Sequence, residues 1–120
     1  MDVNTNMAAY LYARGVIKEE ASIEDAFCFA AEVNACIDNL IEDLRAIEDL
    51  KLISEEELQG LFYEAGKLYF STQLRTWFRI LYEIMFKEDN GPRIGQFVRI
   101  VGVDWILDKL YAVRINPYSV

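Results

Sequence analysis

An apolar stripe between Ile23 and Leu50 is the feature that most constrains how this chain folds. Its members recur every three or four residues, which places them on one face of an α-helix. They are Ile23, Phe27, Ala30, Asn34, Ile37, Ile41, Leu44 and Ile47 or Glu48, widened by Ala26, Ala31, Val33 and Leu40. Ser22 is suited to accept a free amide of the first turn, and the acids that follow it favour the positive end of a helix. The pattern predicts one long helix from Ser22 to about Leu50.

Capping and turn residues divide the rest of the chain into further helical segments. The segment from Val3 to Arg14 is predicted to be a short helix that ends before Gly15. Four more helices are expected, and the residues predicted to cap or start them are Ser54, Ser71 or Thr72, Pro92 and Asp104. Asn90-Gly91 is predicted to form a turn with a positive φ. Two-residue alternation is too brief to predict strands, except at residues 97–103.

Helices therefore dominate, and the predicted fold class is all-α: a compact helical bundle or cage of about five or six helices. The 120 residues have the length of a single helical domain, 1–120, and a 53% hydrophobic composition allows a substantial core. An ordinary tail is expected at Asn116-Pro117-Tyr118. No apolar run reaches the roughly eighteen residues of a membrane span, and the N-terminus lacks the pattern of a signal peptide. We therefore expect a soluble, cytoplasmic protein.

The residue types that catalysis and metal binding need are scarce. The chain has no histidine and two cysteines, Cys28 and Cys36, which a rise of about 1.5 Å per residue separates by about 12 Å along one helix. They are too far apart for a disulfide, and both are expected in the core. Carboxylates such as Asp38, Glu42 and Asp43 are predicted to be solvated surface and not a metal site. We predict no catalytic residue, no metal and no cofactor in this chain.

Charge is divided unevenly along the sequence. Residues 1–60 hold four Lys and Arg against fourteen Asp and Glu, which gives −10, whereas residues 61–120 hold eight against six, which gives +2. Only the second half is therefore suited to face a polyanion such as RNA. The other interpretation of the first half is an ordinary acidic face on its long helix, and that alone explains the −10.

Basic and aromatic side chains gather in the second half. The set contains Arg75, Trp77, Phe78, Arg79, Lys87, Arg93, Phe97 and Arg99. Unpaired RNA bases stack on aromatic rings and guanidinium planes, while Arg and Lys neutralise phosphates. Gly91 and Gly95 are placed to let the backbone approach a base or phosphate closely. RNA binding is one interpretation; the other places Trp77 and Phe78 in the core, because both lie on the apolar stripe of their helix.

Four segments of the second half occur in an order that is characteristic of one protein family. They are Glu56-Glu57-Leu58-Gln59, Tyr63-Glu64-Ala65-Gly66-Lys67, Leu74-Arg75-Thr76-Trp77-Phe78-Arg79-Ile80-Leu81-Tyr82 and Gly91-Pro92-Arg93-Ile94-Gly95-Gln96-Phe97. In order and spacing, the chain from about Glu55 to Leu110 resembles the C-terminal end of class I lysyl-tRNA synthetases. Residues 1–54 match only in helical character and acidity. The domain is accordingly divided into an acidic helical part, 1–54, and an anticodon-binding-like part, 55–120.

The resemblance implies an all-helical cage that receives the anticodon stem-loop of lysine tRNA, joined to an N-terminal catalytic domain. Arg93 and the two glycines, Gly91 and Gly95, are carried over because they match the motif. The whole predicted RNA-binding set is Arg75, Trp77, Arg79, Gly91, Arg93, Gly95, Phe97 and Arg99. The chain departs from the family at the polar run of residues 87–90, whose acids would weaken contact with RNA phosphates.

The catalytic signatures of that family, His-Ile-Gly-His and Lys-Met-Ser-Lys-Ser, are absent from the chain. Adenylate formation, with its ATP and Mg²⁺, is therefore expected only in a parent enzyme. The resemblance implies two partners, the anticodon loop of lysine tRNA and the parent's catalytic domain, and neither DNA nor a membrane. A cut-out C-terminal domain is the favoured prediction. The alternative is a free-standing acidic protein-interaction module derived from that domain, with the helix from Ser22 to Leu50 as its working face.

Overall fold

The computed structural model describes residues 2–115, and the described part of the chain is helical, with no strand. Its elements are α1 (Val3–Ala13), α2 (Ile23–Arg45), the 3-10 turn η1 (Leu50–Leu52), α3 (Glu55–Phe70), α4 (Leu74–Phe86), α5 (Ile94–Val101) and α6 (Val103–Ile115). The all-α prediction of five or six helices is confirmed. The tail predicted at Asn116-Pro117-Tyr118 lies outside the described residues.

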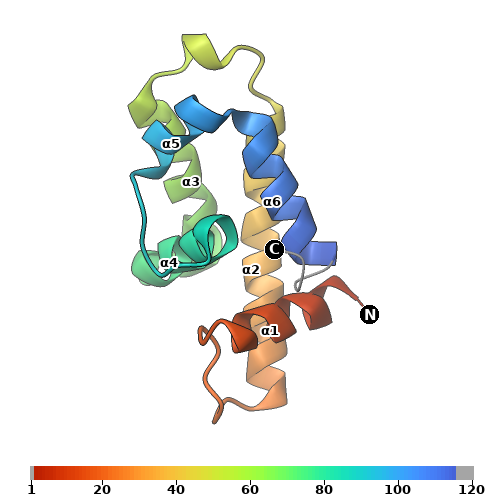
Figure 1. Ribbon diagram of the computed structural model, residues 1–120. Coiled ribbons are helices and arrows are strands. Elements are labelled where there is room, and N and C mark those ends of the chain that lie inside the picture. Colours follow the sequence, from red (N-terminus) through yellow and green to blue (C-terminus); the bar gives the residue numbers. More distant parts are fainter. Residues whose placement is uncertain (1, 116–120) are drawn as a thin grey trace.

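The long helix α2 runs through the middle of the molecule and contacts α1, α3 and α6 (Figure 1). In that view α1 crosses the lower half of α2, and α6 lies beside its upper half. Helix α4 packs against α3 and α6, while α5 packs against α3 and leads directly into α6. Residues 74–115 therefore bring three helices together on one side of the bundle. None of the described helices is long and apolar enough to cross a membrane.

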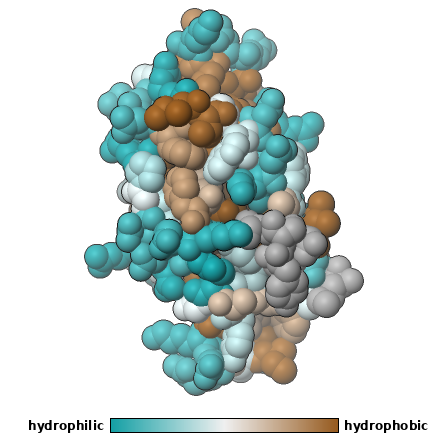
Figure 2. Space-filling view, in the orientation of Figure 1, coloured by the Kyte–Doolittle hydropathy of each residue, from teal (hydrophilic) through white to brown (hydrophobic). Residues whose placement is uncertain are grey.

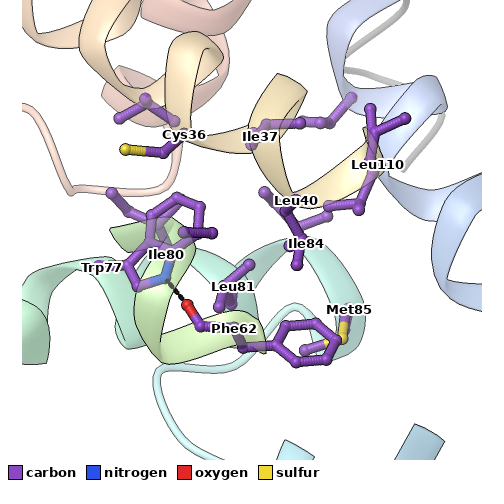
Figure 3. Close-up of a cluster of buried hydrophobic side chains, with 14 of the residues drawn as sticks. Cys36, Ile37, Leu40, Phe62, Trp77, Ile80, Leu81, Ile84, Met85 and Leu110 are labelled. Atoms are coloured by element: carbon purple, nitrogen blue, oxygen red, sulfur yellow. Dashed lines mark hydrogen bonds between the residues drawn. The ribbon is translucent and has the colours of Figure 1, made fainter. Parts of the chain in front are cut away.

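The core is centred on Trp77, the largest of the fully buried side chains. Its indole Nε1 donates a hydrogen bond of 2.8 Å to the carbonyl oxygen of Phe62, so the polar atom of the ring is satisfied inside the protein (Figure 3). The ring stacks on Phe70 at a centroid distance of 6.1 Å. Gly66 makes room for it, because a Cβ at that position would lie 2.2 Å from Cδ1 of the indole. Helices α3 and α4 are thus locked together through one tryptophan.

Two predicted helix starts are confirmed by their capping bonds. The Ser22 side chain accepts a hydrogen bond from the amide of Asp25, and Ser54 forms a complete capping box with Glu57. The first helix also ends as predicted, with Gly15 just beyond it at a φ of 74°. The end of the long helix is wrong by five residues: α2 stops at Arg45, and the chain turns through η1 before α3 begins.

The helix predicted from Arg93 to Val101 is nearly correct, since α5 spans Ile94–Val101, but the other predicted caps are wrong for local reasons. Neither Ser71 nor Thr72 caps α4, because backbone bonds such as Gln73 N–H to the Phe70 carbonyl close that turn. Helix α5 begins at Ile94, two residues after Pro92, and α6 begins at Val103, so Asp104 lies inside it. The positive φ near the predicted Asn90-Gly91 turn belongs to Lys87, at 58°, because that residue ends α4 in the left-handed region.

The two cysteines differ, and the prediction that both are buried is half wrong. Cys36 is completely buried, and burial raises the pKa of its thiol to about 11. Cys28 is exposed, because the N-terminal part of α2 extends beyond the helices that cover it. Ile23 and Phe27, at the same end of the apolar stripe, are exposed as well, at 75% and 40%. The stripe is therefore buried only where other helices reach it.

Candidate nucleic-acid interface

Helix α4 separates its core residues from a set of basic and aromatic ones. Trp77, Ile80, Leu81 and Ile84 are completely buried. Arg75, Arg79, Tyr82 and Phe86 recur at intervals of three or four residues on the opposite side, where they are half-buried or exposed. One helix thus builds the core with one face and presents two arginines and two aromatic rings with the other.

Tyr82 and Phe86 of α4 begin a row of four rings that crosses to α5 and α6. The ring centroids of Tyr82 and Phe86 are 6.0 Å apart, those of Phe86 and Phe97 are 4.7 Å apart, and those of Phe97 and Trp105 are 5.3 Å apart. The ammonium of Lys109 lies over the last ring, 5.2 Å from its centroid. All four rings are half-buried. We call Tyr82, Phe86, Phe97 and Trp105 the aromatic row.

The loop between α4 and α5 is fixed against this row. The hydroxyl of Tyr82 donates a hydrogen bond of 3.0 Å to the carbonyl of Pro92. A Cβ at Gly91 would lie 2.9 Å from Cδ2 of Phe86, so only a glycine lets the loop lie this close to the ring. Figure 2 shows apolar surface over α5 and its junction with α6, with hydrophilic side chains below it over α4. Arg79 of α4 is three residues from Tyr82 on the same helix side, so a phosphate-binding residue type adjoins the aromatic row.

The arginines of α4 are held by an ionic network that includes α1. Glu83 is only 4% exposed, and one of its carboxylate oxygens accepts a 2.7 Å hydrogen bond from Nε of Arg14. The other lies 3.9 Å from Nε of Arg79. Arg14 also donates to the Lys87 carbonyl at 2.6 Å, and Arg79 donates to the Arg14 carbonyl at 3.3 Å. Two guanidiniums from different helices therefore share one buried carboxylate.

The same network borders a buried tyrosine. Desolvation raises the pKa of Tyr10 to about 12, with the positive charge of Arg14 lowering it and the negative charge of Glu83 raising it by smaller amounts. Tyr10 therefore stays neutral at physiological pH, and the charges at this junction belong to the arginines and Glu83.

Two residues predicted to touch RNA lie inside the protein. Trp77 is completely buried, as the core interpretation of its helix had it. Gly95 is buried between α5 and α3: its amide donates to Oε1 of Gln59 at 2.8 Å, and a Cβ there would lie 2.7 Å from the Glu55 carbonyl oxygen. Both residues hold helices together, and neither belongs to a surface that a ligand can reach.

The remaining predicted residues lie at the surface, and they differ in how far other residues hold their side chains. Arg75 is exposed, and Phe97 belongs to the aromatic row. Arg93 is half-exposed, with its Nε 3.7 Å from a carboxylate oxygen of Glu55. Arg99 donates to the carbonyls of Ile53 and Leu50, so it anchors the η1 turn to α5. Its charge remains exposed, but its geometry is set by that turn.

Several residues of this face were not predicted from the sequence, although the spacing of some of them indicated their place. Tyr82 and Phe86 follow Arg75 and Arg79 at helical spacing, and Trp105 and Lys109 are four residues apart. That periodicity was enough to place them together on one helix side. Arg14 left no such signal, because it lies 69 residues from Glu83 in sequence. Only the tertiary fold, in which Arg14 at the end of α1 bonds to Glu83 of α4, brings them together.

Part of the chain is similar to lysine–tRNA ligases. It is 39% identical over 67 residues to that of Roseobacter denitrificans, covering 52% of this chain and 12% of the relative. It is 35% identical over 63 residues to that of Rickettsia typhi, with 49% and 12% covered, and 30% identical over 86 residues to that of Rickettsia akari, with 72% and 16% covered. No family profile and no solved structure matches the chain. The chain is thus partly homologous to lysine–tRNA ligases and spans 12% to 16% of these relatives.

Proposed function

We propose that this chain is a tRNA-binding helical domain that receives the anticodon stem-loop of lysine tRNA. The observation that carries the proposal is the aromatic row, four half-buried rings in contact beside basic side chains. The partial homology to lysine–tRNA ligases supplies the class of RNA. The chain's own contribution is binding and not chemistry; a parent ligase would supply ATP, Mg²⁺ and the catalytic domain as its partner.

The chemistry of the row suits unpaired bases. A base stacked on an aromatic ring contributes about 1–3 kcal/mol whatever its identity, because every base has a π-face. The rings lie in three helices, of which α4 and α5 both pack against α6, so the rings need no ordering when a base arrives. Lys109 over Trp105 and the half-exposed Arg93 place positive charge near the two ends of the row. A single-stranded loop can therefore stack its bases on the rings while its phosphates lie near the cations.

Fluorescence anisotropy with a labelled lysine anticodon hairpin tests the proposal. We expect Trp105→Leu to weaken binding about tenfold at low salt, because it removes one stacking ring while keeping an apolar side chain. Tyr63→Leu is a matched control: Tyr63 is 40% exposed, has Lys67 over its ring at 4.6 Å, and lies outside the row. Equal binding by wild type and Trp105→Leu would remove the row from the interface.

The hairpin experiment also separates the proposal from the acidic protein-interaction alternative. A domain that binds RNA retains the hairpin at low salt and releases it as salt rises. If the folded chain shows no binding at low salt, tRNA recognition fails for this domain. The acidic surface of α2 then becomes the region to test for protein partners.

A further inference from the structure

A second charged feature lies beside the aromatic row and runs along the same helix. Arg75, Arg79 and Lys87 lie on the solvent side of α4 or at its end, and Arg14 joins them from the end of α1. We call these four residues the cationic strip. Glu83 lies between them, and Glu88 and Asp89 follow Lys87, so these four positive and three negative residues give a local charge of +1. This is the opposite of the whole chain, whose net charge is −8.

Glu83 lies at the centre of the strip, where its carboxylate accepts a hydrogen bond from Arg14 and lies 3.9 Å from Nε of Arg79. The side chain of Glu83 is 5% exposed and lies within salt-bridge distance of both Arg14 and Arg79. A buried carboxylate is costly unless its charge is paired, so the two arginines are held where they pair with it. Arg14 is further tied to the Lys87 carbonyl, and Arg79 to the Arg14 carbonyl. The guanidiniums are therefore ordered before any ligand arrives.

Arg14 and Arg79 still have N–H donors that can bind an anion. A guanidinium has five N–H donors. The bonds described above use Nε and one terminal nitrogen of Arg14, and one terminal nitrogen of Arg79, with the Arg79 Nε close to Glu83. The two side chains are still 33% and 40% exposed. Each therefore retains donors toward solvent, in the fork geometry that suits phosphate.

We propose that the cationic strip is a track for the RNA phosphate backbone, and that Glu83 is the positioning residue that orders it. The inference rests on the proposed function and deepens it. Arg79, Tyr82 and Phe86 follow one another on the solvent side of α4, so the strip and the aromatic row are adjacent. A strand whose phosphates lie on the strip has its bases directed toward the row.

The first test removes two strip charges that carry no buried contact. The double variant Arg75→Ala/Lys87→Gly is compared with Arg45→Ala/Lys51→Ala, which removes two exposed cations at the end of α2 and in η1. We measure hairpin affinity between low and moderate salt. Each lost phosphate contact reduces the slope of log affinity against log salt by about 0.7. We expect a reduction of about 1.4 in the strip variant and none in the control.

The second test distinguishes positioning from simple charge. Glu83→Gln makes the strip more positive by one, so diffuse attraction alone would tighten RNA binding. If Glu83 positions the arginines, affinity falls instead, by about tenfold for one lost charge-assisted hydrogen bond. A thermal melt at the assay conditions establishes that the variant remains folded. Should it unfold, Arg14→Lys keeps the charge but loses the fork geometry, and the same weakening is expected.

The outcomes separate the two proposals. No hairpin binding by wild type would overturn the proposed function together with the track. Hairpin binding with an unchanged salt slope in Arg75→Ala/Lys87→Gly would overturn the track alone. Titration with inorganic phosphate distinguishes RNA from a small anion: saturable binding of phosphate at the strip would assign it to a free anion. Tighter RNA binding by Glu83→Gln would overturn the positioning role.

Discussion

The two tryptophans occupy regions with opposite physical roles. Trp77 is completely buried, with its indole N–H bonded to the Phe62 carbonyl and a glycine opposite its ring. Trp105 is half-buried at the end of the aromatic row, with a lysine over its ring. Both lie on helices of similar length. The difference teaches that a tryptophan becomes core where the apolar side of its helix is also covered by neighbours that meet its ring, as Phe62, Gly66 and Phe70 do for Trp77.

The sharpest way to break this comparison is to remove each indole in turn. Trp77→Ala is expected to destabilise the fold by about 3–5 kcal/mol, because it leaves a large cavity and an unpaired Phe62 carbonyl. Trp105→Ala is expected to cost much less, since its ring is already partly in water. Urea unfolding of both variants measures the two free energies. Equal losses would mean that the two regions do not differ as described.

A substitution at Gly66 tests whether the absence of a side chain there is what allows Trp77 to be buried. Gly66→Ala is expected to destabilise the fold by about 1–3 kcal/mol, because the added Cβ overlaps the indole and the core is closely packed. Gly60→Ala is the matched control on the same helix, where a Cβ meets nothing within 4 Å. It should stabilise the fold by about 0.5–1 kcal/mol through helix propensity. A melting temperature that rises in both variants would refute the tight contact.

The two cysteines extend the comparison of interior and surface to reactivity. At pH 8 we expect Cys28 to be alkylated and Cys36 to resist, because it is buried and its thiol pKa is raised to about 11. The raised pKa has a consequence for stability. The contribution of the neutral thiol is complete below its ordinary value of 9.0 and is lost as pH rises through about 11.

Mass spectrometry after timed alkylation measures the first effect, and urea unfolding between pH 8 and 11 measures the second. Cys36→Ala removes the titrating group and serves as the control for the alkaline loss. Tyr10, whose pKa is raised from its ordinary value of 10.0 to about 12, loses its own contribution between those values, so the loss below pH 10 is the part assigned to Cys36. Rapid labelling of Cys36 in the native protein would contradict its placement in the core.

Substitutions at Lys87 are expected to have the smallest effect on stability. They also change RNA binding, because Lys87 belongs to the cationic strip. It ends α4 with a φ of 58°, a conformation that glycine adopts without strain. Lys87→Gly is expected to raise stability by up to about 1 kcal/mol while weakening RNA binding. Lys87→Ala loses the same charge but keeps the strain, so it should weaken RNA binding without the gain. Thermal melts and hairpin titrations separate the two contributions.

Much of the fold was predictable because local rules decided it. The capping bonds of Ser22 and Ser54 depend on residues three positions away, so the sequence contains all that is needed to place them. The start of α4 was not predictable in the same way, because backbone bonds close its turn in place of the expected Ser71 or Thr72 cap. The class all-α rests on the periodicity of α2, which local order alone establishes.

The candidate site was predictable only in part. The sequence set the positive charge of the second half and the spacing of Arg75 and Arg79, because both are properties of the chain itself. It did not set that Trp77 lies inside and Trp105 at the surface, or that Gly95 packs against Glu55. Nor did it join Arg14 to Glu83 across 69 residues. Helical periodicity determines which side of a helix is apolar, whereas the tertiary packing of α3 and α6 against α4, and of α5 against α3 and α6, decided which side chains share a surface.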